Sequence, residues 1–236
     1  VVLSRGLGDV YKRQVMIGEK ISSKNKIDLD KPEVKVLFYR NDLFYISLNQ
    51  NSWETGYKKC LEHHISNRPY FSPISIHPRI ARAMVNLSNC DKNETVIDPF
   101  CGTGGILIEG ADMGLKIIGI DLKEKMIEYT KGNLKHYGFK GQLKNSDFDK
   151  INSFNFDSIV CDPPYGIAST SGGENISDLM NRCLGEFQKS MLKKQRLVIA
   201  VSNPELIRNQ NLTLLKKFEW YIHKSLTRYV MVLEKN

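Results

Sequence analysis

The chain has 236 residues, of which 41% are hydrophobic, and its formal net charge at neutral pH is +8. This length can bury the core of one full α/β domain and a smaller piece, whereas two complete domains would be crowded. The sequence has no run of about 18 uninterrupted apolar residues and no charged segment followed by an apolar one at its start, which excludes a membrane span and a secretory signal and indicates a soluble, cytoplasmic protein.

The charge is unevenly distributed along the chain. The net charge is +5 over residues 1–80, −4 over residues 81–180 and +7 over residues 181–236. An acidic centre between basic flanks fits a polyanion held around a site that binds a cation or an amine. Ordinary solvated lysine-rich faces would give the same distribution, so the charge alone leaves both interpretations open.

The five cysteines are an odd number, and no two of them have the spacing of a metal-ligand pair. In a chain of this size they are expected to be free thiols in a reducing compartment.

The front of the chain predicts little regular structure. Residues 1–14 show no periodicity that joins them to the residues after them, and they resemble a non-native leader, so the fold prediction leaves them out. Two strands are predicted over residues 34–39 and 43–48, joined by a turn at residues 40–42. Because two strands do not form a stable sheet alone, residues 15–66 are expected to be the end of a domain or an extension packed on the main domain.

From residue 79 onward, strands and helices alternate. Strands are predicted over residues 95–97, 116–120, 142–145, 157–161, 197–201, 219–223 and 227–233, and helices over residues 79–87, 105–113, 123–137, 176–192 and shortly after residue 204. This alternation predicts an α/β fold over residues 67–236, with a doubly wound, mostly parallel, seven-stranded sheet. The last two strands are too close in sequence for a crossover, so they are expected to pair antiparallel.

A glycine-rich turn follows the first of these strands, in the stretch Asp98-Pro99-Phe100-Cys101-Gly102-Thr103-Gly104-Gly105. Glycines at such a place let the backbone approach a ligand closely, and open α/β sheets bind ligands at the carboxyl ends of their strands. We therefore expect Asp98, Pro99, Gly102 and Gly104 to bind a cofactor. A tight turn without a ligand would use the same glycines.

Two further acids, Asp121 and Asp147, follow the second and third strands. A carboxylate at Asp98 suits the positively charged amino-acid end of S-adenosylmethionine better than a pyrophosphate, Asp121 is placed to accept from a ribose diol, and Asp147 could meet the adenine amine. Taken singly, each acid could be a helix N-cap. Together they predict S-adenosylmethionine as the cofactor, and no metal is expected.

The stretch Asp162-Pro163-Pro164-Tyr165-Gly166 follows the fourth strand and indicates the chemistry. An exocyclic base amine is a poor nucleophile, and accepting both of its N–H bonds helps it to pyramidalise. The Asp162 carboxylate can accept one N–H, a carbonyl of the Pro163 segment can accept the other, and Tyr165 offers a face on which a flipped base can stack. A rigid strand-ending turn would be the structural alternative, and a glutamine-amide methyltransferase, which typically has Asn at the first position, would be the chemical one.

These motifs resemble those of the archaeal-type tRNA (guanine-10-N2) methyltransferases, in which a THUMP RNA-binding domain precedes a class I methyltransferase domain. The matching stretches are residues 68–73, 78–87, 98–106, 162–166 and 225–228, and residues 27–34 are similar to the late part of a THUMP domain. The resemblance implies methylation of guanine N2 in tRNA, once or twice, by a monomer without membrane contact. It also implies that residues 15–66 are the second half of a THUMP domain whose first half is missing.

Three other functions remain open from the sequence. An N6-adenine nucleic-acid methyltransferase and a guanine-N2 methyltransferase of rRNA would share the core motifs. An RNA-binding protein with a relic methyltransferase fold would be expected to have lost the cofactor acids, and none is lost here.

Several other residues invite a functional interpretation. Cys60, His63 and His64 resemble part of a metal cluster, but no second pair has ligand spacing, so they are predicted to be surface residues. Cys101 is predicted to serve packing, because methyl transfer to nitrogen needs no thiol. His77 could order a loop or contact substrate, and Arg79 and Arg82 could meet phosphate or solvate a helix.

Overall fold

The computed structural model describes residues 35–40, 44–49, 57–72, 75–164, 175–207, 211–223 and 226–236. The chain divides into two compact units, residues 1–58 and residues 59–236. The predicted leader, residues 1–14, and the stretch at residues 27–34 that is similar to a THUMP domain lie outside the described residues.

The first unit contains an antiparallel hairpin of β1 (Lys35–Arg40) and β2 (Phe44–Asn49). Lys35 pairs with Asn49 at one end of the hairpin, and Arg40 pairs with Phe44 at the other. Each observed strand differs from its predicted range by only one residue, and the two strands pair as a hairpin. The predicted hairpin is therefore confirmed.

The second unit is built on a seven-stranded sheet with the order β5-β4-β3-β6-β7-β9-β8. Its strands are β3 (Thr95–Asp98), β4 (Lys116–Asp121), β5 (Gln142–Asn145), β6 (Ser158–Cys161), β7 (Arg196–Val201), β8 (Leu212–His223) and β9 (Leu226–Lys235). The first five are parallel, while β9 pairs antiparallel with β7 and β8. This confirms the predicted doubly wound α/β sheet with an antiparallel end.

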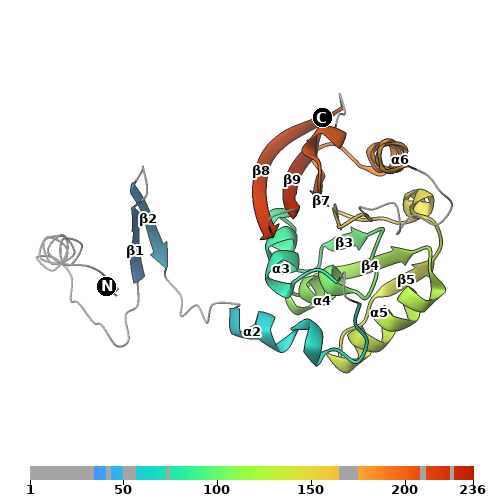
Figure 1. The fold of residues 1–236 in the computed structure, drawn as a ribbon, viewed down its shortest axis with the longest axis horizontal. Helices are drawn as coiled ribbons and strands as arrows, with labels where there is room; N and C mark the ends of the chain where they lie inside the picture. Colours follow the sequence, from blue (N-terminus) through green and yellow to red (C-terminus); the bar gives the residue numbers. More distant parts are fainter. Residues whose placement is uncertain are drawn as a thin grey trace, which may run out of the picture. The chain divides into compact units, whose positions relative to one another are not determined.

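The boundary between the two units falls within α2 (Tyr57–Glu62). The other helices of the second unit are α3 (Pro78–Leu87), α4 (Gly105–Asp112), α5 (Glu124–His136) and α6 (Ile176–Ser190), with 3-10 turns η1 (Ile65–Asn67), η2 (Phe148–Ser153) and η3 (Pro204–Leu206). The sheet lies between α6 on one side and α4 and α5 on the other (Figure 1). Short strands covered on both faces need apolar side chains at nearly every position, as parallel sheets generally do.

Alternate residues of each central strand point into different cores. In β3, Val96 packs with α3 and the start of α4, while Ile97 packs with α6 and η2. In β6, Val160 likewise belongs to the core with α3 and the start of α4, and Ile159 to the core with α6 and η2. This is the two-residue period of a strand buried on both faces, and it explains why the strands read as continuous apolar runs rather than as an alternating pattern.

The structure also corrects several predicted boundaries. β8 begins at Leu212, seven residues before the predicted strand at residue 219. It lies at the edge of the sheet and leaves Leu214, Phe218 and Tyr221 substantially exposed. An edge strand of this kind carries no clear burial pattern, so its first half could not be recognised from the sequence. The elements α2, η1 and η2 were not predicted.

In the described part of the chain, no helix is both long enough and apolar enough to cross a membrane. Within the same residues, no three His, Cys, Asp or Glu side chains gather as a group that could hold a metal ion.

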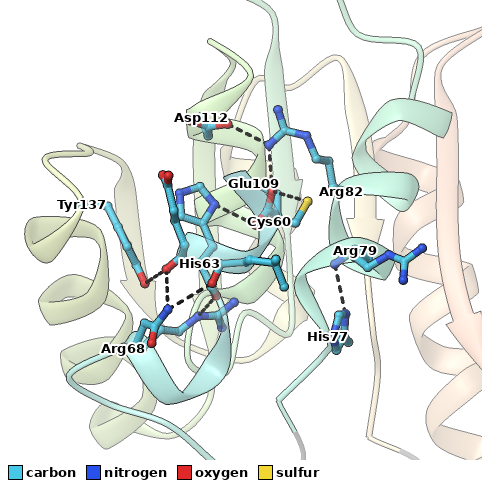
Figure 2. Close-up of polar contacts among 12 residues, drawn as sticks. Cys60, His63, Arg68, His77, Arg79, Arg82, Glu109, Asp112 and Tyr137 are labelled. Atoms are coloured by element: carbon cyan, nitrogen blue, oxygen red, sulfur yellow. Dashed lines mark hydrogen bonds and ion pairs between the residues drawn. The ribbon is translucent and has the colours of Figure 1, made fainter. Parts of the chain in front are cut away.

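A buried polar cluster fastens the stretch after α2 to α4 (Figure 2). Glu109 on α4 is fully buried, and its carboxylate contacts His63 Nδ1 at 2.9 Å and Arg82 Nη1 at 2.9 Å. Arg82 also donates to Asp112 at 2.7 Å, and the Cys60 thiol lies 4.0 Å from the Glu109 carboxylate. The prediction that Cys60 and His63 are surface residues is therefore wrong, since both are buried around a carboxylate from a helix that the sequence does not connect to them.

We expect Glu109→Ala to destabilise the protein by about 3 kcal/mol, because it leaves the buried His63 and the partly buried Arg82 with one acceptor fewer. Glu109→Gln should cost less, since it keeps an acceptor oxygen. Urea unfolding followed by circular dichroism measures both changes.

The matched control is Glu186→Ala on α6, which removes a glutamate whose partner Lys189 is 73% exposed. Its effect should stay within about 0.5 kcal/mol. An equal effect of the two alanine variants would contradict the stabilising role of the Glu109 cluster.

Candidate active site

Three acidic side chains meet at one edge of the sheet because parallel strands end there together. Asp98 and Asp121 are the last residues of β3 and β4, and Asp162 directly follows β6. β3 pairs with β4 on one side and with β6 on the other, so it lies at the point where the strand order reverses. Open α/β sheets form a crevice for ligands at this point.

A cavity opens at this edge, and the empty space in it together with the solvent at its open mouth amounts to about 490 Å³. Asp98, Gly102 and Asp162 line it, together with Ser72 and Ser75 from the stretch that precedes α3. The cavity therefore brings the glycine-rich turn and the residue after β6 to one site, as the sequence suggests.

The glycine-rich turn adopts a backbone that favours glycine at two positions. Gly102 has a φ of 51° and Gly104 a φ of 84°, both in the left-handed region. A Cβ on Gly104 would lie 2.9 Å from Thr130 Cγ2, so α5 packs directly against the turn. Pro99 is buried within the same turn.

Two α5 side chains that the sequence analysis missed hold this turn from behind. Thr130 Oγ1 donates to the Gly102 carbonyl at 2.7 Å, and Asn133 Nδ2 donates to the Thr103 carbonyl at 2.9 Å. They lie three residues apart, on the same face of the helix. No signal in the sequence marks them, because polar residues on an amphipathic helix are usually solvated.

Asn133 also fixes the stretch before α3. Its side chain accepts from the Tyr70 N–H at 3.0 Å and donates to the Tyr70 carbonyl at 2.8 Å. The Tyr70 ring stacks on Tyr129 with ring centroids 4.7 Å apart, and the Ser75 and Thr103 hydroxyl oxygens are 2.8 Å apart. One buried amide thus joins both segments that line the cavity.

The Asp121 carboxylate accepts the N–H of Gly102 and the N–H of Lys123, each at 2.9 Å. It therefore links the end of β4 to the turn. Asp147 precedes η2 but its side chain makes no capping hydrogen bond there. Arg182 donates to Asp147 Oδ2 at 3.3 Å, while Oδ1 is buried and accepts no hydrogen bond from the described residues. An acceptor in this state suits an N–H donor from a ligand.

Asp98 is the most strongly perturbed acid of the group. Burial raises its pKa well above the usual range, and the charges of Asp162 and Asp121 raise it further, against one hydrogen bond from the Phe100 N–H that lowers it. A buried carboxyl in such surroundings is stabilised by a cationic ligand.

Asp162 has a partner that the sequence analysis did not assign. Arg228, near the start of β9, donates from Nη1 to Asp162 Oδ2 at 2.9 Å and from Nη2 to Oδ1. Burial raises the pKa of Asp162, and the hydrogen bonds and charge of Arg228 lower it. Pro163 is buried beside this pair, whereas Tyr165 and Gly166 lie outside the described residues.

The remaining candidates have structural roles. His77 is the N-cap of α3, where its Nδ1 accepts the Arg79 N–H at 3.2 Å, which agrees with a local ordering role. Arg82 belongs to the Glu109 cluster described above, rather than to a free helix face. Cys101 packs in the core between α4 and α5, and burial raises its pKa well above the usual range, as expected for a packing residue.

Comparison with known proteins agrees with this geometry. Residues 66–222 match the RMKL-like methyltransferase domain family. The chain is 32% identical over 245 residues to the tRNA (guanine(10)-N2)-dimethyltransferase of Methanothermobacter thermautotrophicus, covering 99% of this chain and 68% of that relative. The chain belongs to this methyltransferase family.

Two further comparisons extend over most of this methyltransferase. It is 34% identical to the tRNA (guanine(10)-N2)-dimethyltransferase of Pyrococcus abyssi, covering 96% of this chain and 70% of that one. The crystal structure of TrmN from Thermus thermophilus is 20% identical, with a TM-score of 0.62, and the match covers 99% of this chain and 69% of that chain. The predicted class I fold and the predicted use of S-adenosylmethionine are confirmed.

The residues present fit this cofactor. Gly102 leaves the turn open, since a Cβ there would meet only the Phe100 carbonyl oxygen, at 4.0 Å. The buried Asp98 carboxyl lines the cavity and would be stabilised by a cationic ammonium. Asp147 does not line the cavity, but its orphaned oxygen is an acceptor that an amine could use. The proposed role of Asp121, at the end of β4, is to accept a hydrogen bond from the ribose.

We expect Gly104→Ala to weaken binding of S-adenosylmethionine by at least about tenfold, or 1.4 kcal/mol. The added Cβ is strained at this φ and collides with Thr130. Gly138→Ala is the matched control, because its φ of 74° is similar but nothing lies within 4 Å of the new Cβ. Calorimetry measures both affinities, and equal dissociation constants would show that the contact with α5 is irrelevant to binding.

The raised pKa of Asp98 also predicts a pH dependence of cofactor binding. Below that pKa the carboxyl is neutral, and an ammonium group favours the ionised form. As pH rises from below the raised pKa to above it, affinity should increase, and over the rising part binding should release a proton. Calorimetry in buffers of different ionisation enthalpy detects the proton. Asp98→Asn should bind more weakly and lose this dependence, and a wild-type affinity that is constant over the range would refute the assignment.

Proposed function

We propose that this methyltransferase transfers methyl from S-adenosylmethionine to the N2 amine of guanine in tRNA, at position 10. The observation that carries the proposal is that Asp162 lines the same cavity as the glycine-rich turn. The curated relatives named above, whose names specify this substrate, support guanine over adenine.

The protein's part in the reaction is to position and polarise the amine. The Asp162 carboxylate accepts one N–H and the carbonyl of Pro163 accepts the other, which draws the nitrogen lone pair out of conjugation with the ring. The proposed partner for the base itself is Tyr165, through stacking. When bound, S-adenosylmethionine supplies a methyl group on a sulfonium.

The transfer requires alignment rather than a strong base. Asp162 and Pro163 would hold the amine nitrogen in line with the methyl group that the cofactor supplies. The electron pair of the broken sulfur–carbon bond would stay on sulfur, and the methylated nitrogen would lose a proton to solvent. Orientation of this kind and fixed acceptors contribute the larger part of the rate enhancement in such reactions.

We further propose that residues 15–66 are part of a THUMP-like module that docks tRNA, with the catalytic unit acting as a monomer. The support is the similarity of residues 27–34 to that domain and the net charge of +5 over residues 1–80. Lysines and arginines in such a segment favour phosphate contacts.

Nucleoside mass spectrometry tests the substrate. Incubation with labelled S-adenosylmethionine and an unmodified archaeal tRNA transcript should give N2-methylguanosine or its dimethyl form. A transcript with inosine at position 10 lacks only the 2-amino group and should accept no methyl there. N6-methyladenosine as the product, or methylation of rRNA in preference to tRNA, would contradict the proposal.

Asp162→Ala should lower kcat by roughly 100-fold or more, the usual effect of removing a fixed polar group that acts in the transition state. Its affinity for S-adenosylmethionine should be largely retained, because the cofactor acids remain in place. Rapid-quench measurement of one turnover separates the chemical step from binding. Full activity of this variant would refute the proposed mechanism.

A further inference from the structure

The pair formed by Asp162 and Arg228 depends on the antiparallel end of the sheet. β6 and β7 run parallel, so their carboxyl ends share one edge, and Val201 at the end of β7 pairs with Tyr229. Because β9 runs in the opposite direction, its beginning lies at that same edge. Arg228 therefore reaches across β7 to a carboxylate 66 residues earlier in the chain.

Arg228 is itself held in place. Its side chain is 3% exposed, and that of Asp162 is 12% exposed. Trp220 on β8 is its partner in the strand register, and the guanidinium carbon lies 5.6 Å from the centre of the Trp220 ring. An arginine that is stacked and bidentate fixes the plane of a carboxylate as well as its charge.

The pair leaves Asp162 able to accept another hydrogen bond. An ionised carboxylate offers about four acceptor positions, of which the guanidinium occupies one on each oxygen. A protonated carboxyl offers fewer acceptors and carries a donor that competes with the amine. The state of Asp162 therefore decides whether it can receive the N–H of a substrate.

We infer that Arg228 is a positioning residue for methyl transfer, which keeps the Asp162 carboxylate ionised and oriented so that its remaining acceptor positions face the amine. This inference rests on the proposed role of Asp162. It assigns to Arg228 an effect on the chemical step that is exerted through Asp162, without contact with the cofactor or the base.

The charges around Asp162 show why the arginine is needed. Arg228 from β9 favours the carboxylate, whereas burial opposes it. Burial raises the pKa of Asp98 at the end of β3 and the pKa of the Cys161 thiol on β6, and the charge of Asp162 adds to both shifts. Loss of the guanidinium would remove the hydrogen bonds and the charge that lower the pKa of Asp162, and would leave the effect of burial unopposed.

The first test is the pH profile of kcat for Arg228→Met and Arg228→Lys. Loss of the arginine should move the acid limb up by at least about one pH unit, since an adjacent opposite charge usually lowers the pKa of a carboxyl by about 1–3 units. The lysine variant keeps the positive charge but cannot donate two parallel hydrogen bonds to the carboxylate. The acid limb of its pH profile should therefore lie between those of the wild type and the methionine variant.

The matched control is Arg196→Met. Arg196 contacts Glu234 at 3.9 Å near the other end of β9, so it also joins β7 to β9 but lies far from Asp162 along the strands. Its profile should match that of the wild type. An unshifted acid limb in Arg228→Met, even with a lower kcat, would reduce Arg228 to a structural role and overturn the inference.

A double-variant cycle keeps the test informative if single variants are poorly stable. If Arg228 acts through Asp162, then Arg228→Met should cause no further loss of kcat in an Asp162→Asn background, because no carboxylate remains to be held ionised. Losses that multiply in the double variant would show independent roles and would contradict the inference.

A readout without substrate separates this inference from the proposed function. Carbon NMR of the aspartate carboxyls in the cofactor-free protein, with Asp162 assigned by its absence in Asp162→Asn, should show a higher pKa for Asp162 in Arg228→Met than in the wild type. An unchanged titration would overturn the inference. A shifted titration in a protein that does not methylate guanine would refute the proposed function alone.

Discussion

The pairing of β3 with β4 on one side and β6 on the other is the constraint on which the rest of the site depends. It brings the ends of three parallel strands to one edge, and each end carries an acid. Asp98 and Asp162 come within electrostatic reach there although 64 positions separate them. Backbone hydrogen bonds hold these strands side by side, and the apolar cores on both faces keep the sheet buried. The sheet that forms the core therefore also concentrates negative charge at its edge.

Burying several acids at one place has a cost in free energy that the protein offsets in different ways. Asp121 is stabilised by two backbone N–H groups, and Asp162 by a guanidinium. Asp98 has a backbone hydrogen bond from Phe100 but a strongly raised pKa. In the proposed function this last imbalance is relieved by the ammonium of the cofactor, so the acid that is least satisfied in the protein alone is the one that binds the cation.

The backbone of the site is supported by polar groups outside the recognisable motifs. Thr130 and Asn133 hold the glycine-rich turn from α5, and the Glu109 cluster fastens the stretch after α2 to α4. These buried contacts are satisfied by partners far away in sequence, as buried polar groups generally must be. Cofactor affinity is therefore expected to depend on α5 as well as on the glycines that line the cavity.

The sequence alone determined the α/β class, the number of strands and the antiparallel end, because strand and helix periodicities and short connections depend on neighbouring residues. It also placed Asp98, Gly102, Gly104 and Asp162 at strand ends, from which a shared cavity follows for parallel strands. Only the tertiary structure decided which side chains meet across the sheet. Arg228 reaches Asp162 because β9 reverses direction beside β7, and Asn133 joins two segments because α5 packs behind the turn. Such contacts depend on the geometry of packing between distant segments, which no local pattern in the chain encodes.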